Sequence, residues 1–387
     1  MRVISRLHHQ GIVGRNRKFL PIYLCSLLMS FHYGLVLYVN SSFLETFFSQ
    51  IEVAFLFGLG AVLFLTLLLS SELLTQIGAK RIFFIFILVE ALAITILSSA
   101  NSPTLIALGF VLMQGSIGFL TYLLDVFLER EVKDEGTTGE VRGIFLTSAS
   151  IAIILAPIAT GFILSGGSFR SVYFASLMVL IPVLFLQFGK AIEKHSLPKI
   201  HEKIPSSLRL GVFLSFILQF FYGWMIAWSP IYLNQIIGFS WQEIGLIFSI
   251  MLLPFALFEL PLGELEDKMF GEKEIMAGGF LIAGFATVSI SLITSASFVA
   301  WALILFLTRT GASAIEISTE SYFFKHVSGG DTEVIGVFRL ARPLALIMGP
   351  IIGAFSIKLL GFQQSFIVLG AILIASVFLA LRLKDTK

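Results

Sequence analysis

Leu303–Phe324 reads LILFLTRTGASAIEISTESYFF, an apolar stretch interrupted by Arg309, Glu316 and Glu320. The two glutamates follow Arg309 by 7 and 11 positions, close to whole helical turns, so all three charges share one face of a helix. A charged side chain at the bilayer centre costs about 2.5–3.5 kcal/mol on insertion scales, so it normally faces a partner or a water-filled cavity. The stretch therefore predicts a transmembrane helix that lines a polar route.

The composition extends this prediction to the whole chain. Of 387 residues, 57% are hydrophobic and only 13% are charged, which is too little charge to cover the surface of a soluble protein. The apolar residues form blocks of about 16–27, long enough to cross a hydrocarbon core of about 30 Å. We predict an all-α polytopic membrane protein with twelve transmembrane helices, at 19–38, 53–71, 82–97, 104–128, 143–164, 171–188, 210–233, 243–262, 274–294, 298–324, 334–358 and 365–383.

The charges are unevenly distributed between the connections. Most of the 26 lysines and arginines fall in alternate connections and in the two tails, and the other connections have almost none. The positive-inside rule then predicts that both termini are cytoplasmic, which requires an even number of helices. The basic loops need no nucleic-acid partner. We expect an integral protein of the cytoplasmic (inner) membrane, surrounded by the lipid bilayer and acting as a monomer.

The two halves of the chain repeat each other. FHYG at 31–34 matches FFYG at 220–223, and FSQIEV at 48–53 matches FSWQEI at 239–244. EVRGIF at 140–145 likewise matches EVIGVF at 333–338. A duplication of six helices keeps the same orientation and predicts two six-helix bundles related by a pseudo-two-fold axis. The expected boundaries are a cytoplasmic tail at 1–18, bundles at 19–188 and 210–387, and a cytoplasmic linker at 189–209.

GELEDKMFGEK at 263–273 and GPIIGA at 349–354 carry a resemblance to a known family. The first resembles the loop motif of the major facilitator superfamily, and its counterpart near Ser71 and Gly78 is degraded. The second, with APIATG at 156–161, resembles a helix motif of the same family. The chain thus resembles a bacterial-type secondary transporter of that superfamily over its whole length. The resemblance implies alternating access, a cavity lined by the first, fourth, seventh and tenth helices, and an ion-pair role at the gate for Asp267 and Lys268.

Depth along the helices suggests how the charges group. At 1.5 Å per residue, Arg309 lies about 12–16 Å from the outer end of its helix, and the glutamates lie in the inner third. Arg339 and Arg342 enter the next helix from the cytoplasm and are expected in the same layer as the glutamates. Two interpretations remain open: an ion cluster that locks a cytoplasmic gate, with Glu320 paired to Arg339, or a proton-coupling group, for which Glu316 is the main candidate.

Arg309 has no acidic residue at its own depth in its helix. The planar guanidinium suits a carboxylate or phosphate, so we expect it to bind an anionic substrate group. The alternative is hydrogen bonding to carbonyl groups of neighbouring helices. Further candidates for substrate contact lie on helices expected to line the cavity, with packing as the alternative role for each: His32, Gln114, Tyr122, Gln219, Tyr222 and Trp228. Asp125, the approximate repeat counterpart of Glu320, is a candidate for proton coupling or for pairing with Arg142 or Arg130.

The sequence carries no phosphate-binding loop, nucleophile elbow or zinc-protease motif. We therefore expect neither enzymatic activity nor a cofactor or metal site. The favoured function is a secondary active transporter that moves a small solute by alternating access with proton coupling. The substrate is expected to be an anionic or zwitterionic metabolite, and proton-driven efflux of lipophilic compounds is the alternative. A membrane protein that binds ligands or handles lipids without transport is a further alternative.

Overall fold

The computed structural model describes residues 2–71, 78–131, 138–186, 208–326, 338 and 340–384. Over these residues the protein is helical and contains no β-strand, which confirms the predicted fold class. The first half consists of α1 (Arg2–Leu37), α2 (Asn40–Leu44), α3 (Gln50–Leu69), α5 (Ala79–Ser99), α6 (Pro103–Glu131), α7 (Thr138–Gly166), α8 (Phe169–Leu180) and the 3₁₀ turn η2 (Ile181–Phe185). The second consists of α9 (Arg209–Ile231), the π-helical turn η4 (Tyr232–Ile237), α10 (Trp241–Lys268), α11 (Glu272–Ile290), α12 (Phe298–His326), α14 (Ala341–Leu360) and α15 (Phe362–Ala380).

Eleven of the described helices are long and apolar enough to cross a membrane. The sixth predicted span, 171–188, corresponds to a shorter apolar segment, Phe169–Phe185, which comprises α8 and η2. Pro182 lies at the start of η2, where its missing N–H interrupts the α-helical hydrogen bonds and leaves a 3₁₀ turn. This proline shortens the sixth α-helix relative to the prediction. Two other predicted boundaries are not confirmed: α1 begins at Arg2 rather than at 19, and the predicted start of the eleventh span, 334, lies outside the described residues, with α14 beginning at Ala341.

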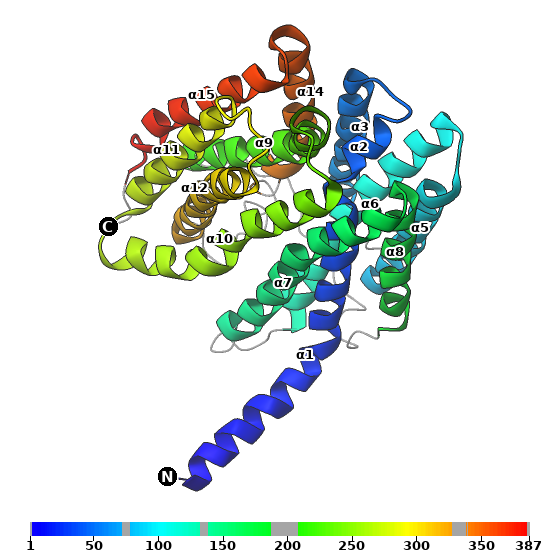
Figure 1. The fold of residues 1–387 in the computed structure, drawn as a ribbon. Helices are drawn as coiled ribbons and strands as arrows, with labels where there is room; N and C mark the ends of the chain where they lie inside the picture. Colours follow the sequence, from blue (N-terminus) through cyan, green and yellow to red (C-terminus); the bar gives the residue numbers. More distant parts are fainter. Residues whose placement is uncertain are drawn as a thin grey trace.

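The helices pack in two groups that follow the chain order. The first bundle, α1–α8, and the second bundle, α9–α15, lie side by side, with α7 against α10 and α3 against α14 (Figure 1). We call the end with the connections at 38–49, 100–102, 166–168, 232–240, 291–297 and 361 the hairpin end. The opposite end, where 186 and 208 lie, is the linker end. The first half of α1 extends beyond both bundles (Figure 1).

The repeated sequence at 48–53 and 239–244 forms equivalent helix starts. Ser49 caps α3, and its backbone N–H and hydroxyl donate hydrogen bonds of 2.8 and 2.7 Å to Glu52 Oε2. Ser240 caps α10 in the same way, with bonds of 2.9 and 2.7 Å to Glu243 Oε2. Each serine–glutamate pair satisfies backbone donors that a helix start leaves free. The internal repeat thus fixes where two equivalent helices begin at the hairpin end.

Glycines allow the two bundles to approach closely between α7 and α10. A Cβ placed on Gly245 would lie 2.3 Å from the backbone oxygen of Pro157, and one on Gly161 would lie 2.7 Å from that of Trp241. Ser249, about one turn further along α10, donates a 2.7 Å hydrogen bond to the Ile154 carbonyl on α7. The APIATG motif therefore forms part of the contact between the bundles, on the hairpin half of the molecule.

Contacts between the bundles continue to the hairpin end itself. The rings of Tyr38 and Phe248 lie 4.5 Å apart, and Gln235 Nε2 donates a 2.9 Å hydrogen bond to Glu45 Oε2. The other oxygen of Glu45, Oε1, is buried and has no hydrogen-bond partner among the described residues. Burial raises the pKa of the Glu45 carboxyl above its usual range, and hydrogen bonds from Gln235 and Gln50 partly oppose this. The contact between the bundles at the hairpin end therefore includes a carboxyl whose ionised form is disfavoured by burial.

Candidate solute-binding site

Arg309 lies buried in the middle of α12, with 2% of its surface exposed. Its guanidinium carbon lies 4.9 Å from the ring centroid of Phe221 and 5.1 Å from that of Tyr222, both on α9. Nη1 has no hydrogen-bond partner among the described residues. The aromatic pair comes from the repeated FFYG sequence, so the repeat supplies the surface on which this cation rests.

The stacking only partly compensates for the burial of this charge. Cation–π contacts contribute about 2 kcal/mol or more when desolvated, whereas removing an isolated cation from water costs several kcal/mol after relaxation. Tyr38 of the first bundle faces the same guanidinium across the interface. A buried guanidinium that both bundles contact, and whose Nη1 has no hydrogen-bond partner among the described residues, is suited to bind an anionic group of a solute.

Tyr222 connects Arg309 to the acidic residues of α12. Its hydroxyl donates a 2.7 Å hydrogen bond to Glu316 Oε2, while its ring lies against Arg309. Glu316 is half-buried and lies two helical turns from Arg309, about 10 Å along the helix axis. The structure therefore brings three of the predicted residues, Arg309, Tyr222 and Glu316, into one connected group.

A layer of carboxylates lies on the linker side of this group. Glu259 of α10 is half-buried and interacts electrostatically with both Glu316 and Glu320. Arg342, at the start of α14, interacts with Glu316 and also with Tyr33 of the first bundle. Glu320 and Arg342 are exposed to solvent, whereas Arg309 is buried. Glu316 therefore interacts both with the like charge of Glu259 and with the opposite charge of Arg342.

His32 is placed differently from the expectation of substrate contact. It is completely buried inside the first bundle, where Nε2 lies 3.0 Å from Glu90 Oε1 on α5. Nδ1 lies 2.9 Å from the Ser176 carbonyl oxygen and 2.8 Å from its hydroxyl on α8. We therefore leave His32 out of the solute site. Its contacts also identify the partner of Glu90, which the sequence alone does not.

For four further candidates, the structure gives no contact that supports substrate binding, and three of them pack against neighbouring residues. Trp228 is fully buried, and its Nε1 donates a 3.1 Å hydrogen bond to the Pro350 carbonyl. Tyr122 belongs to the buried cluster on the linker half of the first bundle and stacks on Phe119. Gln114 packs against Gly60 of α3. Gln219 is half-buried on α9. None of these geometries favours a ligand contact over packing.

The predicted gate residues are only partly described. Arg339 and the side chain of Asp267 lie outside the described residues. Lys268 forms an exposed 2.7 Å ion pair with Glu264 in its own helix, which is a surface contact of α10 rather than a link between bundles. Asp125 and Arg142 are half-buried on α6 and α7. The gate assignment for these residues stays a prediction.

Two residues of the site were not singled out from the sequence. Glu259 is the only charged residue of α10 between Glu243 and Glu264. A single acidic residue in an apolar span could have indicated a functional position. Tyr38 lies at the hairpin end of α1, where aromatic residues are common and carry no specific signal. The packing of α10 against α12 shows the place of Glu259, and the interaction of Tyr38 with Arg309 shows that of Tyr38.

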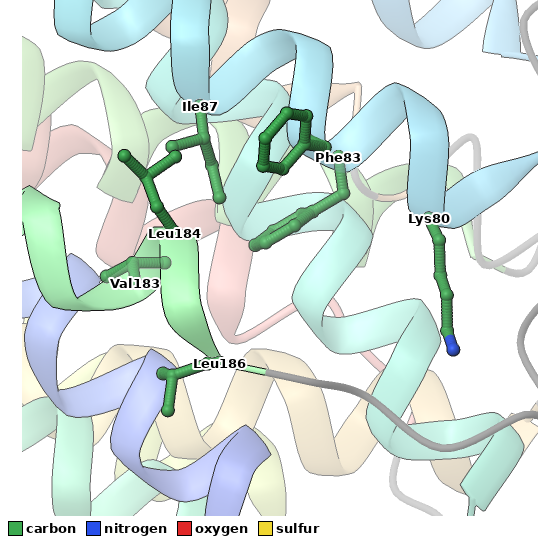
Figure 2. Close-up of a pocket in the computed structure, with 7 residues that line it drawn as sticks. Lys80, Phe83, Ile87, Val183, Leu184 and Leu186 are labelled. Atoms are coloured by element: carbon green, nitrogen blue, oxygen red, sulfur yellow. The ribbon is translucent and has the colours of Figure 1, made fainter.

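A separate cavity of about 250 Å³ lies between α5 and η2 in the first bundle. Its lining is apolar apart from Lys80, whose Nζ points away from the cluster of Ile87, Val183 and Leu184 (Figure 2). The cavity contains none of the residues around Arg309. It offers no polar partner that would orient a solute, so we do not assign it to the transport route.

Solved structures with similar folds are transporters. The fold is similar to that of a POT family transporter in complex with 5-aminolevulinic acid, with a TM-score of 0.80, 13% identity, and 94% of this chain and 95% of that chain covered. For a point mutant of the nucleoside transporter NupG, the TM-score is 0.71 and the sequence identity is 14%, and the match covers 94% of this chain and 99% of that chain. For the human organic anion transporter MFSD10 (TETRAN), the TM-score is 0.66 and the sequence identity is 15%, and the match covers 95% of this chain and 99% of that chain. At these identities the likeness shows the fold alone.

Sequence comparison gives the family directly. No curated protein sequence matches the chain. The family model described as Major Facilitator Superfamily matches residues 20–241 and again 210–387. The two matches overlap and together cover nearly the whole chain. Together with the helical fold and the membrane-spanning helices, this confirms the predicted resemblance: the chain belongs to the Major Facilitator Superfamily.

Proposed function

We propose that the chain is a secondary active transporter that moves small anionic or zwitterionic solutes by alternating access of its two bundles. The observation that carries the proposal is the buried Arg309 guanidinium, which rests on Phe221 and Tyr222 and keeps Nη1 without a partner among the described residues. Family membership supports transport and a small-molecule substrate. The charge of the site supports the choice of solute class.

Proton coupling is proposed to occur at Glu316, with Glu259 as its neighbour. A proton taken up by Glu316 changes the charge beside Tyr222 and therefore the surroundings of Arg309, because the hydroxyl of Tyr222 binds Glu316 and its ring contacts the guanidinium. Glu259 adds a second carboxylate that opposes ionisation of both groups through like-charge repulsion. Solute and proton would thus bind in contact with the same tyrosine.

The unequal distribution of contacts supports a state closed at the hairpin end. The close contacts of α7 with α10, and the bond between Gln235 and Glu45, lie in the hairpin half. The exposed Arg342 and Glu320 lie towards the linker end. With both termini cytoplasmic, as the charge distribution predicts, the acidic layer would open to the cytoplasm. We further propose that the protein acts as a monomer in the cytoplasmic membrane.

Reconstitution in proteoliposomes tests the proposal. Counterflow of small carboxylates, amino acids and organic phosphates is compared with that of sugars and lipophilic cations. We expect counterflow of an anionic or zwitterionic solute in the wild type and in Glu316→Gln. Uptake driven by a pH gradient should fall about tenfold or more in Glu316→Gln, because that variant cannot release the proton.

The matched control is Glu264→Gln, which alters an exposed carboxylate of α10 outside the layer of Glu259, Glu316 and Glu320. It should retain uptake driven by the pH gradient. Equal gradient-driven uptake in wild type and Glu316→Gln would contradict the coupling role. Counterflow of lipophilic cations alone would contradict the solute class.

A further inference from the structure

The cavity between α5 and η2 lies outside the proposed transport site and arises where the sixth span changes its helical form. α8 ends at Leu180, and Pro182 turns the residues that follow into the 3₁₀ turn η2. α5 continues beside this turn as a regular α-helix. Because a 3₁₀ turn is narrower than an α-helix, η2 leaves space against α5, and the cavity of about 250 Å³ lies there beside Phe83 and Ile87.

The corresponding helices of the second bundle, α11 and α15, pack differently. α15 is a regular α-helix from Phe362 to Ala380. A Cβ placed on Gly284 of α11 would lie 2.6 Å from Ile374 Cγ1, and one on Gly370 of α15 would lie 2.5 Å from Val288 Cγ2. These positions have no room for even one methyl group. The space beside η2 is therefore a property of the first bundle and not of the repeated fold.

The outward face of α5 places this cavity next to the bilayer. Phe84, Ile85, Leu88 and Leu92 are large, apolar and exposed, and their spacing puts them on one face of the helix. Such a stripe on a membrane-spanning helix contacts lipid chains. Arg81, on the same face one turn before Phe84, is exposed and charged, so the head-group region begins near it. Phe84 also lines the cavity, which therefore adjoins the lipid chains.

The cavity has a basic end and an apolar end. Nζ of Lys80 points away from the cluster of Ile87, Val183 and Leu184 (Figure 2). Ile87 lies seven residues, or about 10 Å, further along α5, towards the middle of the membrane. This order of charge and apolar surface matches a phospholipid with its phosphate at the surface. The linker end is predicted to be cytoplasmic, and basic pockets between helices on that side bind anionic lipid head groups.

The size of the cavity and the chemistry of the bilayer narrow the choice of ligand. Pockets for whole small molecules usually measure about 300–1,000 Å³, so this smaller space suits one part of a ligand, such as a length of acyl chain. Apolar contacts alone do not select one lipid over another, because the bilayer is equally apolar. Any selection must therefore come from the charges of Lys80 and Arg81.

We propose that the cavity is a binding site for an anionic phospholipid. Its acyl chain fills the space between α5 and η2, and its phosphate binds Lys80 and Arg81. The bound chain supplies the contacts that the 3₁₀ turn does not make with α5, so it holds the end of the sixth span in place. The stability of the first bundle at the linker end then depends on the head-group charge of the surrounding lipids.

Native mass spectrometry of the purified full chain in detergent tests the proposal without reference to transport, because it counts bound lipids directly. The probes are phosphatidylglycerol and phosphatidylcholine with identical acyl chains. We expect the wild type to bind one phosphatidylglycerol about fivefold or more tightly than phosphatidylcholine. Lys80→Gln should weaken phosphatidylglycerol binding about fivefold, the factor that corresponds to about 1 kcal/mol for one basic side chain, and should leave phosphatidylcholine binding unchanged.

A second variant tests the acyl-chain part of the site. Val183→Phe fills the cavity from its buried wall and should weaken the binding of both lipids. Leu184→Phe, which fills it from a half-buried position, serves if Val183→Phe does not fold. The matched control is Arg382→Gln, which removes an exposed basic residue just beyond the end of α15, at the linker end of the second bundle. It should bind both lipids as the wild type does.

Three results would overturn the proposal. Equal affinities of the wild type for the two lipids would show that the site does not select an anionic head group. Unchanged phosphatidylglycerol binding when the cavity is filled would place the lipid elsewhere. An equal loss of phosphatidylglycerol binding in Lys80→Gln and Arg382→Gln would show a general attraction of anionic lipids to the linker end.

Discussion

The Tyr222 hydroxyl donates a 2.7 Å hydrogen bond to Glu316 Oε2, and the ring of the same tyrosine lies 5.1 Å from the guanidinium carbon of Arg309. One side chain of α9 thus contacts both the candidate anion-binding group and the candidate proton-binding group of α12. Binding of a solute and binding of a proton can therefore influence each other through a single residue.

Tyr222→Phe should separate the two roles. The variant keeps the ring beneath Arg309 and removes only the hydrogen bond to Glu316. Hydrogen bonds to charged groups contribute about 1.5–3 kcal/mol, so uptake driven by a pH gradient should fall about tenfold or more. The affinity for the anion that stabilises the wild type should change less than about twofold, as measured by calorimetric titration.

Tyr222→Ala is the companion variant, since it removes the ring as well as the hydroxyl. It should lower the affinity and the gradient-driven uptake together. If both variants reduce affinity to the same extent, the ring does not support Arg309 in the way the geometry indicates.

Closure of the hairpin end should depend on pH through Glu45. Its pKa is raised in this closed structure, so the closed form binds a proton more readily than a form in which Glu45 faces water. The closed form is therefore favoured at low pH and loses that advantage as the pH rises from the ordinary glutamate value, about 4.3, through the raised one. Glu45→Gln should stay closed across this range.

Spin labels on the exposed positions Ser102→Cys and Thr294→Cys, one in each bundle, report the opening as a change in their distance distribution. Cys25 is buried and does not need replacement. The control is Glu264→Gln, an exposed carboxylate outside this contact. A distribution that changes with pH as much in Glu45→Gln as in the wild type would assign the effect to another group.

The contact of Gly245 with Pro157 should be intolerant of even one methyl group. A Cβ at this position would lie 2.3 Å from a backbone oxygen, which cannot move without shifting α7. We expect Gly245→Ala to destabilise the closed structure by about 1–3 kcal/mol, the range found for overpacked cores. Thermal unfolding in detergent and the spin-label distances both measure this.

Gly278→Ala is the matched control, because a Cβ there meets no atom within 4 Å. Removing a glycine from the interior of α11 should leave stability unchanged or raise it by about 0.5–1 kcal/mol. Equal unfolding temperatures for Gly245→Ala and Gly278→Ala would show that α7 and α10 are not in this contact in solution.

Short-range sequence patterns were sufficient to predict where several helices begin and which charged residues share a helix face. Helical periodicity predicted that Arg309 and Glu316 lie on one face, and the family resemblance predicted that the helix of Tyr222 lines the same cavity. The matched serines Ser49 and Ser240 mark equivalent helix starts, because a capping box is a short-range interaction encoded within four residues.

Long-range pairing was not predictable in the same way. His32 and Glu90 are 58 positions apart, and nothing in either local sequence indicates that α1 and α5 bring them within 3.0 Å. Two lone polar residues in apolar spans were a signal that partners exist, without identifying them. Glu259 joins the acidic layer for a similar reason, since only the packing of α10 against α12 places it near Glu316.

A thermal-shift panel tests most directly whether Arg309 binds an anionic group of the solute. Wild type, Arg309→Gln and Arg309→Lys are unfolded with organic anions, zwitterionic amino acids, sugars and lipophilic cations. A ligand at about 100 times its dissociation constant stabilises the folded protein by about 2.7 kcal/mol, which is readily measured. We expect an anion or zwitterion to raise the unfolding temperature of the wild type, to raise that of Arg309→Lys less, and to leave that of Arg309→Gln unchanged. Equal stabilisation of all three proteins by the same compound would contradict it.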